Sequence, residues 1–170
     1  MDNSSTLKAI RVRLATIDGP GSAKKVIHEV TEFERLLTED IYPDDCLQLV
    51  IDVISLPSLA SIAGMQLFVA SLFSDMPRLS DEQAARFLVA ARASLPTLQR
   101  VELCWALCDL VARCYEKQVA FSFLVDVATE AQPTAIEGVV LGLDVLRMHN
   151  KDDRTITDAM ARIARPGVGG

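Results

Sequence analysis

Histidine and cysteine, the side chains that most often hold metals or act as nucleophiles, are few in this chain of 170 residues: two histidines and four cysteines. His28 opens the segment His-Glu-Val-Thr-Glu, which has the spacing of the helical zinc-protease motif. That motif needs a second histidine as metal ligand, and this chain has Glu32 there. His28 and Glu32, four residues apart, would instead share a solvated face of a helix. We expect no zinc site.

Cys104 and Cys108 are also four residues apart and could bind one metal ion from a helix face. Each is flanked by apolar residues, however, and a free cysteine is among the residues most often buried as a small hydrophobe. The cysteines show no spacing typical of a disulfide framework, and the charged N-terminal residues lack the apolar run of a signal peptide. The sequence therefore predicts core cysteines and a cytoplasmic protein.

The remaining candidates for chemistry are weak. His149 precedes Asn150 at the end of a predicted helix, where a protonated ring complements the helix dipole. The glycines of Gly19–Gly21 lack the lysine and the preceding strand of a phosphate-binding loop. We expect no catalytic residue, no metal and no cofactor, so that an enzyme is the less favoured alternative.

Composition favours helices. Half of the residues are apolar but only 5% are aromatic, and leucine, alanine, valine and isoleucine supply most of the apolar mass. The length fits one domain over residues 1–170. Acids outnumber bases by 23 to 17, for a net charge of −6, which disfavours binding to a nucleic-acid backbone.

Acidic residues gather where bases are absent, since no lysine or arginine occurs from residue 36 to residue 77. A basic protein partner could bind there. Alternatively, Asp44 and Asp45 lie at the N-terminus of a helix, where carboxylates cap free amides and interact favourably with the helix dipole. The candidate partner-binding acids are Glu39, Asp40, Asp44 and Asp45.

The chain repeats itself. The pentapeptide Ser55–Leu59 recurs nearly unchanged as Ser94–Leu98, and a weaker copy surrounds Pro133. Prolines 20, 57, 96, 133 and 166 are 37, 39, 37 and 33 residues apart, a period typical of stacked helical hairpins. We expect Pro57, Pro96 and Pro133 each to open a helix, because proline suits the first helical position.

Apolar spacing and capping signals then predict about nine helices. Residues 80–83 read as a capping box, residues 57–74 as one helix that is apolar nearly all round, and Asp152 or Asp153 as the cap of a last helix. The predicted units are hairpins at about 5–37, 44–74, 80–115 and 118–149, and a terminal helix at 153–165.

This period and its proline corners resemble the HEAT and armadillo class of helical repeats. The resemblance implies an all-α fold, a right-handed stack of antiparallel helical hairpins, and a role in protein binding. The position four residues past each proline holds Ser61, Arg100 and Glu137, without the recurring residue of typical HEAT units. An irregular helical bundle is therefore the alternative.

In such a stack the second helices of successive hairpins line one face, which we take as the candidate binding surface. Trp105, the only tryptophan, lies on it, as a binding hot spot or as a core anchor between hairpins. The candidate residues are Phe68, which aligns with Leu107 and Asp144 eleven residues past the prolines, Arg100, Glu102, Trp105, Asp109, Glu137 and Asp144.

The sequence thus predicts a cytoplasmic, non-enzymatic module that binds another protein, as an adaptor or as an immunity protein that neutralises a toxin. The 22 uncharged residues from 53 to 74 give the alternative of a membrane-associated protein or a secreted effector that inserts or docks this run on lipid. The proline and the serines within the run favour a buried corner and helix. The sequence leaves the oligomeric state open.

Overall fold

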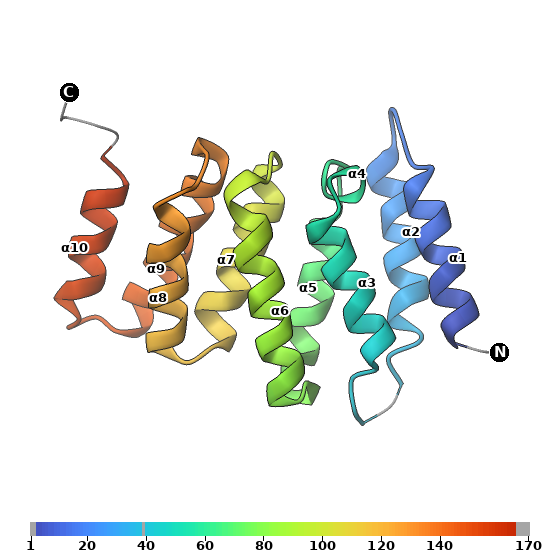
Figure 1. Ribbon diagram of the computed structural model, residues 1–170, viewed down its shortest axis with the longest axis horizontal. Coiled ribbons are helices and arrows are strands. Elements are labelled where there is room, and N and C mark those ends of the chain that lie inside the picture. The colour runs from blue at the N-terminus through green and yellow to red at the C-terminus, as the bar shows by residue number, and fades with distance from the viewer. Residues whose placement is uncertain (1–2, 39, 166–170) are drawn as a thin grey trace. The chain divides into compact units, whose positions relative to one another are not determined.

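The computed structural model describes residues 3–38 and 40–165, and within them it contains ten α-helices, two short 3₁₀ helices and no strand (Figure 1). The all-α class is therefore confirmed. The chain divides into two compact units, residues 1–94 and 95–170, with the boundary inside the predicted third hairpin. The single domain over 1–170 remains a prediction.

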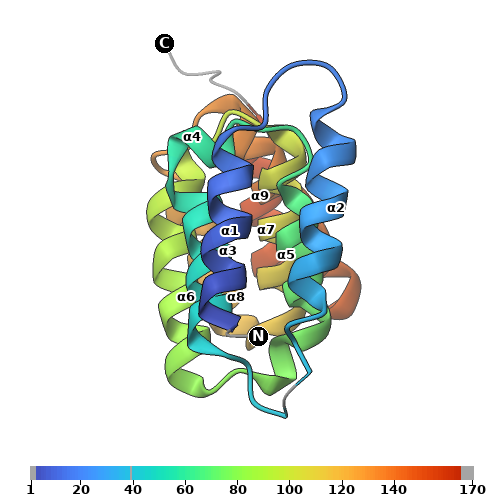
Figure 2. The ribbon, with the colours of Figure 1, turned by 90° about the vertical axis from the view of Figure 1, so that its right-hand side faces the viewer.

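Unit 1 has two layers of helices. Helices α1, α3 and α6 lie side by side, and α2 and α5 pack against them as a second layer (Figure 2). Between the layers Phe33 of α2 and Phe68 of α5 meet edge to face, with ring centroids 5.5 Å apart. The helices are α1 (Asn3–Ala15), α2 (Ser22–Glu34), α3 (Asp44–Ser55), α4 (Pro57–Ala60), α5 (Gln66–Asp75), the 3₁₀ helix η1 (Met76–Arg78) and α6 (Asp81–Ser94).

The continuous helix predicted from Pro57 to residue 74 is wrong. Pro57 does open a helix, but α4 is a single turn, and the chain breaks before α5 begins at Gln66. Gly64 makes the break with a φ of +100°, a conformation that suits only glycine here, because a Cβ would also lie 3.3 Å from Ala23 Cα of α2. Among the described residues no helix combines the length and apolar character that crossing a bilayer requires.

The predicted capping box at the start of α6 is confirmed. The Gln83 amide donates to Ser80 Oγ at 3.1 Å, and the Ser80 amide donates to Gln83 Oε1 at 3.0 Å. Gln83 Nε2 also donates to the Tyr42 carbonyl at 2.9 Å and to Asp44 Oδ1 at 2.8 Å. This one buried side chain therefore ties the connector between α2 and α3 to the start of α6.

Unit 2 is built around α9, which contacts each of the other three α-helices of this unit. Pro133 is its first residue, as predicted, and Asp153 caps α10 by accepting from the Thr155 amide at 3.0 Å. The elements are the 3₁₀ helix η2 (Leu95–Thr97), α7 (Val101–Cys114), α8 (Lys117–Ala128), α9 (Pro133–His149) and α10 (Arg154–Ile163).

The expectation that Pro96 opens α7 is wrong. Pro96 lies in η2 and is buried, and α7 begins five residues later, after Arg100 adopts an extended conformation. The Pro96 carbonyl instead accepts from the Gln132 amide at 3.0 Å, so that this corner holds the start of α9. The repeated pentapeptides thus share one feature, a single helical turn after the end of the preceding helix, and differ in how far the next long helix lies from the proline.

The closest helix contact in unit 2 joins α7 to α9. A Cβ on Gly138 would lie 2.8 Å from the Cys104 carbonyl oxygen, and a Cβ on Gly142 would lie 3.1 Å from the Cys108 carbonyl oxygen. Glycines four residues apart on α9 therefore face cysteines four residues apart on α7, in the same chain direction. The two helices run parallel and approach closely because glycine leaves room for the neighbouring backbone.

Replacing Gly138 by alanine should destabilise the protein by about 1–3 kcal/mol, as overpacking does, despite the helix propensity that alanine gains. Urea denaturation followed by circular dichroism measures this. Gly142→Ala should cost less, because its closest contact, 2.9 Å, is to the flexible end of Leu124. Adding Cys104→Ala should not rescue Gly138→Ala, since the clash is with backbone. A Gly138→Ala protein as stable as the wild type would contradict the contact.

Candidate functional site

Six of the predicted binding residues lie on the outer face of α7 and α9, and none of the six is buried. Trp105 is 42% exposed, so it is not a fully buried anchor of the core. We call this surface the α7–α9 face. Its members are Arg100, which is the N-cap residue of α7, Glu102, Trp105 and Asp109 on α7, and Glu137 and Asp144 on α9.

The close packing of the two helices sets the register of this face. Trp105 follows Cys104, and Leu141, which is 37% exposed, precedes Gly142. Because Cys104 and Cys108 match Gly138 and Gly142, the two exposed apolar residues lie within one helical turn of each other along the pair. Each helix therefore contributes one large apolar side chain at a similar height.

Charge is unevenly distributed along this face. Glu102 and Glu137 both act on the Cys104 thiol, whose pKa is raised to about 12, mainly by burial and further by these two carboxylates. Two exposed carboxylates from different helices thus lie near the same buried atom. Both carboxylates lie at the N-terminal half of the face. Trp105 lies there too, because it is three residues after Glu102 and next to Cys104.

The acids at the other half of the face are balanced by arginines of their own helices. Asp109 accepts from Arg113 at 2.7 Å, and Asp144 accepts from Arg147 at 2.6 Å. Both pairs are partly exposed, so each adds little to stability. The N-terminal half of the face thus carries two carboxylates, Glu102 and Glu137, and one base, Arg100, which leaves a net negative charge in the region of Trp105.

Phe68 must be removed from the predicted site. It is fully buried against Phe33, and Leu107, which was aligned with it, is fully buried too. The alignment fails because α5 begins nine residues after Pro57 and α7 five residues after Pro96, whereas α9 begins at Pro133 itself. Equal distances from the prolines therefore do not reach equivalent helix positions.

The acidic segment is only partly a free surface. Asp44 and Asp45 lie in the first turn of α3, and Asp44 accepts hydrogen bonds from Gln83 at 2.8 Å and from Arg86 at 3.4 Å. Asp40 and Asp45 are exposed. Glu39 lies outside the described residues.

The segment that resembles the zinc-protease motif binds an arginine. Glu29 is buried and receives two hydrogen bonds of 2.9 Å from Arg13 of α1, which also pairs with Glu32. The carboxylates raise the pKa of Arg13, with the Glu29 hydrogen bond as the largest cause. His28 is exposed. This cluster therefore joins α1 to α2, and within the described ranges no three ligand-type side chains converge as a metal site would require.

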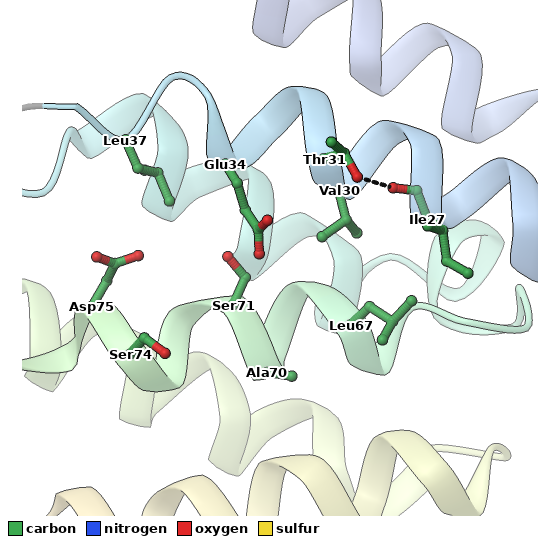
Figure 3. Close-up of a pocket in the computed structure, with 10 residues that line it drawn as sticks. All are labelled: Ile27, Val30, Thr31, Glu34, Leu37, Leu67, Ala70, Ser71, Ser74 and Asp75. Carbon is green, nitrogen blue, oxygen red and sulfur yellow. Dashed lines mark hydrogen bonds between the residues drawn. The ribbon is translucent and has the colours of Figure 1, made fainter.

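A groove between α2 and α5, with a volume of about 550 Å³, is a second candidate site, and the sequence analysis did not predict it (Figure 3). Each helix contributes one face, with residues at helical spacings of three and four. We call it the α2–α5 groove. Its lining residues are Ile27, Val30, Thr31 and Glu34 of α2, Leu37 beyond it, and Leu67, Ala70, Ser71, Ser74 and Asp75 of α5.

The α2–α5 groove changes character along its length. Figure 3 shows Ile27 opposite Leu67 at one end, Glu34 directed toward Ser71 in the middle, and Asp75 at the other end. The order of these residues means that α2 and α5 run parallel. Small side chains on α5 leave the space open, so that the groove has an apolar end and an acidic end.

The sequence matches no protein-family model and no curated protein, and no solved structure matches the fold. The geometry of the two surfaces is therefore the basis for the functional argument.

Thiol reactivity should follow burial. Cys46, Cys104 and Cys108 are fully buried and burial raises the pKa of both Cys104 and Cys108, whereas Cys114 is only partly covered. A thiol-reactive dye should therefore label one cysteine in the folded protein and all four after unfolding in denaturant.

Cys114→Ser should remove the labelling of the folded protein. Because burial also raises the pKa of Cys114, labelling of the wild type should be slower than that of a free cysteine. Rapid labelling of Cys104 or Cys108 in the native state would contradict the packing of α7 against α9.

Proposed function

We propose that this protein is a non-enzymatic module that binds another protein through the α7–α9 face. The observation that supports this most is Trp105, a 42% exposed tryptophan three residues after Glu102 on α7 and opposite the turn of α9 that carries Glu137. Exposing tryptophan to water is costly, and tryptophan is over-represented among residues that dominate binding energy. A partner that covers Trp105 would recover that cost.

The partner that fits this face is a protein with a basic, partly apolar surface. Lysine or arginine side chains could pair with Glu102 and Glu137, and an arginine could also stack on the indole ring of Trp105. The net charge of −6 would add long-range attraction and speed the encounter. Nucleic acid is disfavoured by the same charge.

An adaptor and an immunity protein that neutralises a toxin both agree with this chemistry, and a cytoplasmic location agrees with the four cysteines, which form no disulfide with one another. The membrane-associated alternative has less support, because the uncharged residues 53–74 are divided among the end of α3, α4 and α5. Many of them are buried within unit 1, including Leu59, Phe68 and Leu72.

Trp105→Ala should weaken binding to a stoichiometric partner, isolated by affinity capture and then purified, by about 2 kcal/mol or more, because a central aromatic contact is lost. Isothermal titration calorimetry measures the affinity. Phe73→Ala is the matched control: Phe73 is an aromatic residue with a similar exposed fraction, 39%, on α5 of the other unit.

Equal effects of the two variants, or none, would contradict the assignment of the α7–α9 face. The proposed attraction to a basic partner is tested separately, by measuring the association rate at increasing ionic strength. The association rate should fall as salt is added. An association rate that is the same at low and high salt would leave Trp105 in place as an anchor but would rule out a basic partner.

A further inference from the structure

We propose that the α2–α5 groove is a second binding site, which takes a short segment of a protein carrying an aliphatic residue and, three positions later, an arginine or lysine. This goes beyond the α7–α9 face, since the groove lies within unit 1 and shares no residue with that face.

The apolar end of the groove supplies the aliphatic part of the site. Ile27 is 52% exposed and lies opposite Leu67, with Val30 and Ala70 next along the groove (Figure 3). An aliphatic side chain placed between Ile27 and Leu67 would remove apolar surface of both helices from water, which is favourable in proportion to the area covered. Ala70 leaves room for it.

The acidic end supplies the charge. Glu34 is the last residue of α2 and Asp75 is the last residue of α5, and both line the groove. Because α2 and α5 run parallel, their C-terminal dipole ends, which are negative, lie at the same end as these two carboxylates. Neither helix has a basic residue in its last turn. The two carboxylates and the negative ends of the two helices therefore add to one negative potential. A cation bound at this end of the groove would be stabilised by that potential.

Part of this negative charge is already balanced. Arg78 binds Asp75 at 2.7 Å and the Leu37 carbonyl at 3.2 Å with the same nitrogen. Glu34 is exposed, and no ion pair to it is found among the described residues. Arg35, the exposed C-cap residue of α2, follows Glu34 directly but does not line the groove. Glu34 is therefore the carboxylate that we assign to a partner's cation.

The distance between the two ends sets the spacing of the segment. Ile27 and Glu34 are seven residues apart on α2, a rise of roughly 10 Å along the helix. A peptide in the polyproline II conformation advances about 3.1 Å per residue and returns to the same side every three residues, so a spacing of three residues covers roughly this distance with both side chains facing the groove. The hydroxyl of Ser71, which faces Glu34, and that of Ser74, one turn further toward Asp75, also line the groove, where they can accept or donate hydrogen bonds to the backbone of such a peptide.

The test uses the full chain labelled with ¹⁵N and the peptide acetyl-Leu-Ala-Ala-Arg-amide as the probe. Titration should shift the amide signals of Thr31, Glu34, Ser71 and Ser74 in a saturable way. The peptide with citrulline in place of arginine keeps the shape and loses the charge, and should bind roughly two- to fivefold more weakly, as expected for a partly exposed ion pair.

Glu34→Gln should reduce the affinity for the arginine peptide by the same factor and should remove the preference over citrulline. Glu82→Gln, the same charge change at an exposed residue of α6 outside the groove, should leave both unchanged. Ala70→Phe should block both peptides by filling the groove, while the unfolding transition stays cooperative.

Absence of saturable shifts, equal affinity for the two peptides, or shifts confined to α7 and α9 would each overturn the proposal. Shifts of the groove signals on dilution without peptide would show that a second copy of the chain occupies the groove, and would overturn it too. Trp105→Ala should leave peptide binding unchanged, and Glu34→Gln should leave the Trp105-dependent partner bound, so that either proposal can fail alone.

Discussion

The close approach of α9 to α7 at Gly138 is the constraint on which the rest of unit 2 depends. A Cβ at that position would lie 2.8 Å from a backbone oxygen of α7, which no side-chain rearrangement can relieve. With glycine there, the two helices fix each other's register, and α8 and α10 pack against α9. The same register places Trp105 beside the carboxylates of Glu102 and Glu137. The core contact and the α7–α9 face therefore depend on the same register of the two helices.

Signals that act within a few residues could be predicted from the sequence. The capping box of Ser80 and Gln83, the cap by Asp153 and the start of α9 at Pro133 each depend on a local hydrogen bond or on the fixed φ of proline, so that the residue types alone indicate them. The all-α class follows from apolar spacing in the same way. Six of the predicted binding residues lie outside the core, because exposed and buried positions alternate regularly along helices, and their role in binding stays a prediction.

The errors arose where contacts distant in sequence decide the backbone. Gly64 interrupts the helix predicted over residues 57–74 at a point where the chain packs on α2. Pro96 lies in a 3₁₀ turn, and its carbonyl accepts a hydrogen bond from the Gln132 amide. Neither partner is near in sequence. The burial of Phe68 follows from these shifts. The α2–α5 groove was not predicted from the sequence. The small side chains of Ala70, Ser71 and Ser74 leave an open space only because α2 lies opposite them, and the packing of α2 on α5 is not visible in the sequence. Acidic residues at the ends of two helices gain significance only once the helices are known to run parallel.

The most direct test of the central contact is a nuclear Overhauser measurement on the protein labelled with ¹³C and ¹⁵N. The structure predicts strong cross-peaks from the Gly138 α-protons to the α- and β-protons of Cys104, and from those of Gly142 to the Leu124 methyl groups. The cross-peaks of Gly138 would fix the register of α9 on α7 at Cys104, and those of Gly142 would fix the packing of α8 on α9. Their absence, with Gly138 instead giving cross-peaks to residues one helical turn away from Cys104, would contradict the register and with it the placement of Trp105 beside Glu137.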